Sequence, residues 1–544
     1  MCGIIGYVGE KESAGQIVHS GLKKLQYRGY DSCGIAVEDK SCLETEIALT
    51  HALGSPDNID EARLHPSRCA IGHTRWATHG RVNLQNAHPH YSFNHKVYLV
   101  HNGVIENYNK LKRFLQEHTD WTFYSDTDSE ILANLIAFYL QGCTDPLDAL
   151  RSALKDVKGT VGIAVLFSGK DGLYGARRGS PLVLGVSNND YYLSSDTNAL
   201  PPDVDKVIYL EDGQIVHLNN LGFYLYNVDE TISSKYKVED IKIDEHSSSH
   251  EGYLCFMEKE IMQQPQAIRD AMLGRINEDL SSIRFGGINL ERDLLKDVKR
   301  ILFLGCGTAH HAGLVGKYMI ENIANIPASA ELASEYKYKN NPTEDRTLVI
   351  AITQSGETID TLAALKEAQN KGLDCIAITN VVSSSIARQA GKGIYQHAGA
   401  EISVASTKAF TSQVTIVLML AILLGRRKGL SVLDAKKHIE QLKSLPSLAK
   451  ECLSPPYLRQ IEFAATKYRD KKKFIFLGRQ TMYPIALEAA LKLKEISYLD
   501  AQGYAAGEFK HGPLALVDED CVCIYFATQD ELVEKNISNI QEIK

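Results

Sequence analysis

The sequence predicts a sheet-rich α+β domain followed by two α/β domains with parallel sheets. Three observations support this prediction. Short strand-like runs dominate the first 240 residues, strand–turn–helix units dominate the chain from Val298 onward, and one such unit occurs twice. With 544 residues, the chain is long enough for three or four domains.

The first region, residues 2–240, alternates strand-like runs with helical stretches. The runs that predict strands are residues 4–8, 34–37, 97–101, 161–167 and 207–210. Helices are expected over residues 15–25 and 129–140, and this mixture predicts an α+β domain with much sheet. Polar residues 240–250 end in three serines and predict a linker, after which we expect a helical stretch over residues 252–273.

After connecting helices within residues 241–297, the pattern changes to strand, turn and helix. Residues 301–305 and 348–352 are apolar, and each run leads through a turn rich in small polar residues into a helix. This alternation predicts a parallel sheet covered by helices. We expect the first α/β domain over residues 298–430 and the second over residues 465–544.

An internal repeat supports the two-domain prediction. Residues 301–305 (ILFLG) match residues 474–478 (FIFLG), and in the same register ASEY at 333–336 falls on AGEF at 506–509. This register places Lys544 opposite Lys371, where the first copy continues. The repeat therefore predicts an incomplete second domain, with roughly 55 further residues expected beyond Lys544.

Composition narrows the class of protein. Hydrophobic residues make up 44% and charged residues 23%, and the formal net charge is −8. These values indicate a soluble protein that acts on small molecules rather than on nucleic acid, and the start of the chain has no pattern of a signal peptide. The apolar run 414–424 is too short for a membrane span and predicts a buried helix. The 11 scattered cysteines indicate a reducing, cytoplasmic compartment.

Cys2 is the first candidate for catalysis. Removal of Met1 would place an α-amino group, whose usual pKa is about 8, beside the thiol. One residue would then supply both nucleophile and base. Gly3 is expected to leave room for a substrate. Taken alone, however, a cysteine at this position is more often a small packing residue than a nucleophile.

Several residues form candidate partners of Cys2. Arg75, in the loop HTRWATHG at 73–80, can bind a carboxylate through two hydrogen bonds. The amide of Asn102 and the backbone N–H of Gly103, at the end of a strand, can form an oxyanion hole. Asp128 offers a carboxylate to a substrate ammonium, although residues 125–130 also fit a helix N-cap.

Two hydroxyl-rich loops in the first α/β domain predict an anion site. Residues 353–358 (TQSGET) lie between a strand and a helix, and residues 403–407 (SVAST) precede a long helix. Hydroxyls and N–H groups at helix N-termini bind anions, and loops at the carboxyl ends of parallel strands converge. The alternative for residues 353–358 is an ordinary capped helix.

A third group of candidates lies in the second α/β domain. Glu488, Lys492 and Glu495 recur at helical spacing and share one face, which is either a solvated ion-paired stripe or part of a site. His511 suits proton transfer near neutral pH but is also typical of a turn or surface. Adjacent His310 and His311 lack further ligands at metal-binding spacing, so no metal is expected.

Beyond these separate patterns, the chain resembles a known family along nearly its whole length. The start CGIIG, the run YRGYDS at 27–32, the loop 73–80 and NAHPH at 86–90 resemble class II glutamine amidotransferases. The later domains resemble sugar isomerase (SIS) domains. Together they resemble the glutamine–fructose-6-phosphate aminotransferase family, which implies an αββα N-terminal nucleophile domain, no cofactor and a homodimer.

The resemblance implies a role for each candidate residue. In the first domain, Cys2 attacks glutamine, Asn102 and Gly103 stabilise the oxyanion, and the substrate is bound by Arg75, Asp128, Thr78, His79 and Gly80. Trp76 would gate the exit of ammonia or simply pack in the core, and Arg28 would lie near the nucleophile. The sugar phosphate would contact Thr308, Thr353, Gln354, Ser355, Thr358, Val404, Ser406 and Glu488. Glu495 would move the proton between C1 and C2, with Lys492 stabilising negative charge and His511 assisting ring opening in a partner subunit.

Three functions therefore remain open at the level of sequence. The first is transfer of the glutamine amide nitrogen to fructose 6-phosphate with isomerisation to glucosamine 6-phosphate. The second is a truncated or regulatory sugar-phosphate-binding protein with glutaminase activity only, because the family's Schiff-base lysine is expected beyond Lys544. The third is transfer of ammonia to a phosphoribosyl acceptor, against which the SIS repeats argue.

Overall fold

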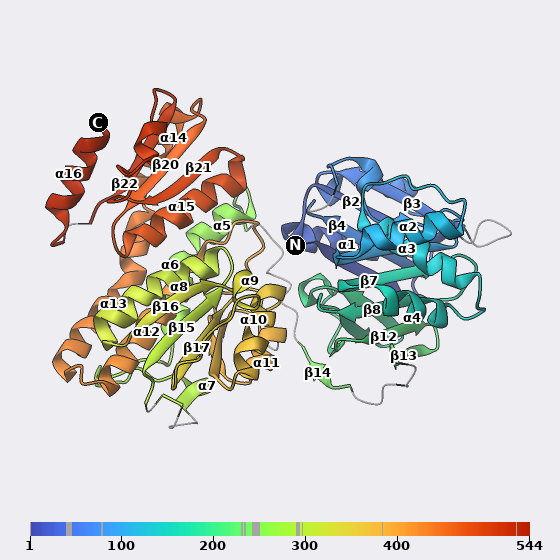
Figure 1. Ribbon diagram of the computed structural model, residues 1–544, viewed down its shortest axis with the longest axis horizontal. Helices are drawn as coiled ribbons and strands as arrows, with labels where there is room; N and C mark the ends of the chain where they lie inside the picture. Colours follow the sequence, from blue (N-terminus) through green and yellow to red (C-terminus); the bar gives the residue numbers. More distant parts are fainter. Residues whose placement is uncertain are drawn as a thin grey trace. The chain divides into compact units, whose positions relative to one another are not determined.

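A computed structural model describes residues 2–39, 46–77, 80–229, 232, 236–241, 251–289, 294–295, 297–382, 384–528 and 530–544. The chain forms two compact units, Met1–Ser249 and His250–Lys544 (Figure 1). Most of the expected linker, residues 242–250, lies outside the described residues.

The first unit contains two antiparallel sheets. The larger sheet has the order β14-β11-β9-β10-β1-β4-β2-β3, and the smaller has the order β13-β12-β8-β7-β6-β5. The larger sheet consists of β1 (Gly3–Val8), β2 (Ser32–Asp39), β3 (Glu46–Leu53), β4 (Cys69–Arg75), β9 (Val183–Ser187), β10 (Asp190–Ser194), β11 (Lys206–Tyr209) and β14 (Val238–Asp240). The smaller sheet consists of β5 (His90–Tyr91), β6 (Val97–Ile105), β7 (Gly159–Phe167), β8 (Leu173–Arg178), β12 (Gln214–Asn219) and β13 (Gly222–Asn227).

Helices cover the outer faces of these two sheets. α1 (Ala14–Leu25) packs Val18, Leu22 and Leu25 against the larger sheet. The smaller sheet is covered by α2 (Tyr108–His118), α3 (Asp128–Leu140) and α4 (Pro146–Asp156). A third apolar cluster fills the space between the sheets. This is the predicted αββα architecture, and the five predicted strands and two predicted helices are confirmed.

The second unit begins with a five-stranded parallel sheet of order β16-β15-β17-β18-β19. Its strands are β15 (Arg300–Gly305), β16 (Ala328–Leu332), β17 (Thr347–Ile352), β18 (Asp374–Thr379) and β19 (Gly393–Tyr395). One face is covered by α8 (Thr308–Met319), α12 (Lys408–Arg427) and α13 (Val432–Cys452), and the other by α10 (Ile359–Asn370) and α11 (Ser385–Ala390). The predicted parallel sheet with helices on both faces is confirmed (Figure 1).

α12 contains the apolar run that the sequence assigned to a buried helix. It is long and apolar enough to cross a membrane by length and composition, but 78% of its most apolar window is buried inside the unit. Ile416, Leu420 and Leu424 belong to the largest apolar cluster. The helix is therefore a core element of a soluble fold, as predicted.

The second copy of the repeat is present in the predicted register. Its parallel strands are β20 (Lys473–Gly478), β21 (Asp500–Ala505) and β22 (Cys521–Phe526), in the order β21-β20-β22. This order matches β16-β15-β17, and α15 (Met482–Ser497) and α16 (Val533–Ile543) occupy the positions of α8 and α10. The aligned short helix α9 (Ala333–Tyr336) and its counterpart each bury an aromatic ring, since Tyr336 and Phe509 are both 2% exposed.

The connecting region contains the predicted helical stretch. Within residues 252–273 it forms two helices, α5 (Phe256–Met262) and α6 (Gln264–Met272), and the short helix α7 (Gly286–Asn289) follows. Pro265 stands in the first turn of α6. Proline has no N–H to continue a preceding helix but fits the start of a new one, which explains why the stretch divides here. α14 (Pro455–Tyr468) likewise starts with proline, immediately before the second copy.

Candidate active site

Cys2 lies directly before β1, beside the end of β4, because Gly3 is paired with Thr74. The backbone N–H of Trp76 donates a hydrogen bond to Cys2 Sγ at 3.3 Å. Burial raises the pKa of the Cys2 thiol, whereas the Trp76 N–H and the charge of Arg75 act in the opposite direction. The thiol therefore keeps its proton near neutral pH and needs a base to become a nucleophile.

Gly3 has a different role from the one expected from the sequence. A Cβ atom at this position would lie 2.7 Å from Thr74 Oγ1 and 2.8 Å from Leu25 Cβ. Such contacts are too close for any side chain. The glycine lets β1 pack tightly against α1 and β4 behind the nucleophile, and this packing replaces the expected space for a substrate.

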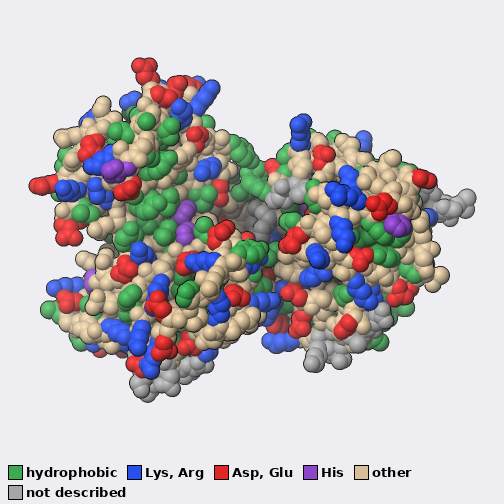
Figure 2. Space-filling model, viewed as in Figure 1, with side chains coloured by type: hydrophobic (Ala, Val, Ile, Leu, Met, Phe, Trp, Pro, Cys, Tyr) green, Lys and Arg blue, Asp and Glu red, His purple; other side chains and the backbone are tan. Residues whose placement is uncertain are grey.

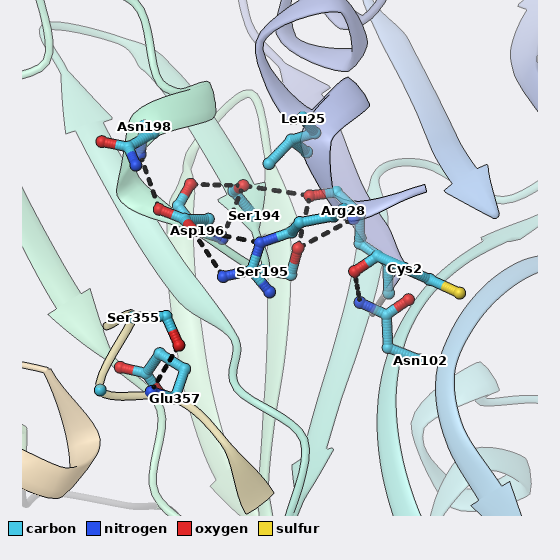
Figure 3. Close-up of polar contacts among 12 residues, drawn as sticks. Cys2, Leu25, Arg28, Asn102, Ser194, Ser195, Asp196, Asn198, Ser355 and Glu357 are labelled. Carbon is cyan, nitrogen blue, oxygen red and sulfur yellow. Dashed lines mark hydrogen bonds and ion pairs between the residues drawn. The ribbon is translucent and has the colours of Figure 1, made fainter. Parts of the chain in front are cut away.

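The two predicted oxyanion donors lie next to Cys2, but inside β6 rather than in a turn after it, because the strand continues to Ile105 and stays paired with β7. Asn102 Nδ2 donates to the carbonyl oxygen of Cys2 at 3.0 Å (Figure 3). Gly103 has a φ of 143°, and a Cβ atom there would lie 2.1 Å from Thr160 O. Only glycine fits this position, which fixes the backbone N–H beside the Asn102 carboxamide.

The two charged candidates for binding glutamine lie at the ends of neighbouring elements. Arg75, the last residue of β4, is 3% exposed, and its guanidinium donates to the carbonyls of Arg81 at 3.2 Å and Gly80 at 3.4 Å. Asp128 is the first residue of α3 and accepts from the Ile105 N–H at 2.8 Å. Burial lowers the pKa of Arg75, while the nearby Cys2, Asp31 and Asp128 oppose this effect. Opposite charges are thus held near the thiol.

The segment that carries Asp128 is also the helix cap that its sequence allowed. Thr127 Oγ1 accepts from the Glu130 N–H at 3.3 Å, and the Glu130 carboxylate accepts from the Tyr124 and Ser125 N–H groups at 2.8 and 2.7 Å. These bonds satisfy backbone donors that the helix itself leaves unpaired. The cap and the candidate substrate contact are therefore compatible, because they use different side chains.

The remaining candidates of this site come from the loop after β4. Trp76 is half-buried and meets the Tyr30 ring edge-to-face at 5.3 Å between centroids. Gly80 adopts a φ of 76° and is exposed. Thr78 and His79 lie outside the described residues.

Arg28 lies in the same unit but makes a structural ion pair. It is buried, and its Nη2 lies 2.5 Å from Asp196 Oδ2 (Figure 3). Beside this pair, Ser195 Oγ accepts from the Ile4 N–H at 2.9 Å, which ties the end of β10 to β1. The pair therefore supports the sheet that carries Cys2, and no sequence pattern pointed to Asp196 as the partner of Arg28.

Sequence reasoning assigned no role to four buried histidines behind the nucleophile. They are His73, His88, His90 and His101. The rings of His73 and His88 stack at 4.2 Å, and those of His88 and His90 meet edge-to-face at 4.5 Å. Burial lowers the pKa of His73 to about 3 and holds those of His88 and His90 well below the usual value. The sequence shows that these histidines lie beside the other motifs. It does not show that β4, β5 and β6, which carry His73, His90 and His101, bring them together.

The first hydroxyl-rich loop joins β17 to α10. Thr353 Oγ1 accepts from the Gly356 N–H at 3.2 Å and lies 3.3 Å from Thr358 Oγ1. Ser355 Oγ accepts from the Glu357 N–H at 3.2 Å (Figure 3), and Gln354 is half-buried. Thr358 is the N-cap residue of α10, but its side chain makes no capping bond there. The hydroxyls thus gather at a helix N-terminus, as an anion site requires.

The second hydroxyl-rich loop is held by two acidic residues that the sequence did not point to. Glu401 accepts from Ser406 Oγ and from the Thr407 N–H, each at 2.8 Å. Burial raises the pKa of Glu401. Glu260 of α5 accepts from the Ser403 N–H at 3.1 Å, and Val404 between them is half-buried. The loop is therefore fixed before any ligand binds.

The charged face of α15 is packed against α8. Glu488 accepts from Thr308 Oγ1 at 2.9 Å and lies 2.7 Å from His311 Nδ1. Lys492 Nζ lies 2.7 Å from Glu495 Oε2 and donates to Thr308 Oγ1 at 3.1 Å. The side chains of Glu488 and Lys492 are only 7% and 18% exposed, so this face is not a solvated stripe.

Two histidines of the second unit differ in their exposure: His311 is half-buried and His511 is exposed. His311, which the sequence singled out only as a possible metal ligand, shares the face of α8 that carries Thr308. Its position three residues after Thr308 was the signal for this contact. His511 is exposed in the turn after β21, where its N–H donates to Glu508 O at 3.0 Å.

This fold and these sites define a class of protein: a glutamine amidotransferase joined to sugar isomerase domains. Residues 55–224 match the glutamine amidotransferase domain family. Residues 294–423 and 467–543 match the SIS domain family. The second match is split in two, in agreement with the internal repeat.

Full-length relatives define the family more narrowly. The chain is 41% identical to "Glutamine--fructose-6-phosphate aminotransferase [isomerizing]" of Chlorobaculum tepidum over 559 residues, which cover all of this chain and 88% of that protein. It is 42% identical to the protein of the same name of Bacteroides thetaiotaomicron, again over all of this chain and 88% of that protein. The chain belongs to the glutamine–fructose-6-phosphate aminotransferase (isomerizing) family and is an enzyme.

A solved structure resembles the second unit. It is the C-terminal domain of glucosamine-fructose-6-phosphate aminotransferase from Francisella tularensis, with a TM-score of 0.52 and 39% sequence identity. The similarity covers 54% of this chain and 82% of that structure. The fold of the SIS repeats is therefore shared with a member of the same family.

Proposed function

We propose that this enzyme transfers the amide nitrogen of L-glutamine to D-fructose 6-phosphate and isomerises the product to D-glucosamine 6-phosphate. L-Glutamate is the second product. The observation that carries this proposal is the position of Cys2 beside the Trp76 N–H and the Asn102 carboxamide, in a chain that aligns over its whole length with named aminotransferases.

The first half-reaction uses the site around Cys2. Arg75 binds the α-carboxylate and Asp128 the α-ammonium of glutamine, which directs the side-chain amide to the thiol. After removal of Met1, the free α-amino group takes the thiol proton and Cys2 attacks the amide carbon. Asn102 and Gly103 stabilise the oxyanion, ammonia leaves, and water hydrolyses the thioester. In this proposal Thr78, His79 and Gly80 line the glutamine site, and Trp76 gates the passage by which ammonia leaves.

The second half-reaction uses the SIS repeats. The loop 353–358, through Gln354, Ser355 and Thr358, holds the phosphate, and Thr308, Thr353, Val404 and Ser406 surround the sugar. Ammonia adds to the C2 carbonyl and water leaves, which gives an imine. Glu495 then carries a proton from C1 to C2, while Lys492 stabilises the negative charge of the intermediate.

The compartment and the assembly are part of the same proposal. Described cysteines such as Cys33 and Cys375 are buried free thiols, which supports a cytoplasmic location. We infer a homodimer in which the exposed His511 assists ring opening in the partner subunit's site. Co-expression of His511→Asn with Glu495→Gln chains would restore part of the activity only if the two residues act in shared sites.

The decisive experiment measures both products. The protein is incubated with glutamine and fructose 6-phosphate, and glutamate and glucosamine 6-phosphate are quantified separately. We expect equal amounts of the two. Glutamate without amino sugar would contradict synthesis by this chain but leave the role of Cys2 intact, whereas neither product would contradict both.

A further inference from the structure

The side chain of Asn102 is held from both sides. On one side its Nδ2 donates to Cys2 O at 3.0 Å, and on the other its Oδ1 lies 3.0 Å from His73 Nε2. A carbonyl oxygen only accepts hydrogen bonds, so the NH₂ end of the carboxamide must face Cys2. The oxygen end then faces His73, which must donate from Nε2.

This donation fixes the tautomer of His73. The ring is fully buried, and burial lowers its pKa to about 3, so the imidazole is neutral and carries one proton. With that proton on Nε2, Nδ1 is a bare acceptor. Within the described part of the chain, no partner lies in hydrogen-bonding geometry with His73 Nδ1, whichever nitrogen carries the proton. The contact of Nε2 with Asn102 Oδ1 therefore selects the tautomer.

The orientation of the His73 ring is in turn set by its neighbours. It stacks on His88, whose Nε2 lies 2.9 Å from Ser129 Oγ. Ser129 Oγ also lies 3.0 Å from His101 Nδ1, and His101 Nε2 lies 3.3 Å from Thr160 O. The contacts form one chain of hydrogen bonds if His88 donates to Ser129, Ser129 to His101, and His101 to Thr160. Ser129 directly follows Asp128, so the histidines connect both ends of the glutamine site.

We propose that His73 is a positioning residue for glutamine hydrolysis: its Nε2–H holds the Asn102 carboxamide with Nδ2 toward the oxyanion. Without this bond, the carboxamide can rotate by a half-turn and present its oxygen to the developing negative charge. Rotation would replace attraction by repulsion at the atom where charge appears. The inference rests on the proposed function of Asn102 and adds the residue that selects its orientation.

The test is a matched pair of variants at position 73. His73→Met removes the donor, and His73→Gln has a similar size but offers an amide N–H. We expect His73→Met to lower kcat for glutamate release about 10- to 100-fold, less than or equal to the loss of one oxyanion donor. The KM for glutamine should change less than about twofold, since Arg75 and Asp128 are untouched. His73→Gln should recover most of kcat.

A double-mutant cycle separates this inference from the proposed function. If His73 acts through Asn102, then His73→Met has little further effect on kcat in an Asn102→Ala background. A full additional loss there would overturn the positioning role. An Asn102→Ala variant with unchanged kcat would instead overturn the oxyanion role itself.

A measurement on the unmodified protein covers the case in which variants fail to fold. Ring-nitrogen chemical shifts of ¹⁵N-labelled histidine distinguish the two neutral tautomers. We expect one histidine, identified as His73 by its loss in His73→Gln or by contacts to Asn102, to remain in the Nε2–H form between pH 5 and 8. An Nδ1–H form would contradict the proposal.

Discussion

The glutamine site and the sugar-phosphate site hold their polar groups in opposite ways. Around Cys2, backbone groups at strand ends fix the important side chains, as with Arg75 on two carbonyls and Asp128 on an N–H group. On α15, Glu488, Lys492 and Glu495 form one ion-paired row, which side chains of α8 also contact. Backbone groups thus organise the proposed glutamine site, whereas side-chain contacts organise the charged row of the proposed sugar-phosphate site.

The largest expected effect is that of a substitution in the proposed glutamine site around Cys2. Cys2→Ala should lower glutamate release by about 1,000-fold or more, because no other group can form the thioester. Binding of fructose 6-phosphate, measured by calorimetry, should not change. Cys143→Ala is the matched control, since this half-buried thiol lies at the end of α3. Equal loss in the two variants would contradict the assignment of the nucleophile.

The next effect tests the independence of the charged row. Glu495→Gln should lower formation of glucosamine 6-phosphate about 100- to 10,000-fold by removing the proton carrier. Glutamate release should stay within about twofold of the unmodified enzyme. Glu534→Gln, at an exposed position in the first turn of α16, serves as control. Parallel loss of both products would show that the two sites cannot be treated separately.

The buried histidines predict that the first unit loses stability in mild acid. His73, His88 and His90 have folded-state pKa values below the unfolded value of about 6.5, so the unfolded chain binds more protons as the pH falls below that value. The stabilisation is complete above about pH 6.5. By pH 5.5, the free energy of unfolding should fall by about 1 kcal/mol for each histidine. The lowered pKa values of His51 and His217 add to this loss, whereas the raised pKa of Glu130 acts in the opposite direction.

Urea unfolding at pH 7.5 and 5.5 would measure this loss. Trp76 and Trp121 are the two tryptophans of the chain, and both lie in the first unit. Their fluorescence therefore reports on that unit. Ordinary carboxylates titrate mostly below this pH window, so an equal or higher unfolding midpoint at pH 5.5 would contradict the prediction.

The smallest expected effect concerns the partner of Glu488. His311→Phe leaves the buried carboxylate with Thr308 and Lys492 only, at a cost of about 1–2 kcal/mol. We expect the Kd for fructose 6-phosphate to rise about tenfold, with partial recovery in His311→Gln. Calorimetry would measure both, and an unchanged Kd in His311→Phe would show that His311 does not support the site.

Local patterns were sufficient for the architecture and for the positions of most candidate residues. The apolar runs at 301–305 and 474–478 defined both copies of the repeat, because a buried parallel strand is a continuous apolar run. Asp128 could be placed at a helix start for a similar reason, whereas Asn102 was expected at a strand end and lies inside β6. Pro265 marks where the helical stretch divides into α5 and α6.

Contacts between distant elements were beyond such reasoning. His73 meets Asn102 because β4 and β6 belong to different sheets that face each other, and nothing local in either strand fixes that pairing. The same applies to His311 with Glu488, which lie on helices of different repeats. Gly3 shows a related error, since its neighbours Leu25 and Thr74 come from α1 and β4. In each case the packing of sheets and helices, not periodicity, decided the outcome.

The register of the repeat also shows how the two copies have diverged. Opposite the loop 353–358 lie residues 526–531, where Asp530 and Glu531 bring negative charge to the position of the predicted phosphate site. Opposite Glu488, Lys492 and Glu495 lie the uncharged residues Val315, Met319 and Asn322. Under the proposed function, the first copy of the repeat binds the phosphate and the second carries the proton. A chain with two copies of the first repeat would bind sugar phosphate but lack the residue that moves the proton. A chain with two copies of the second repeat would lack the loop that binds the phosphate.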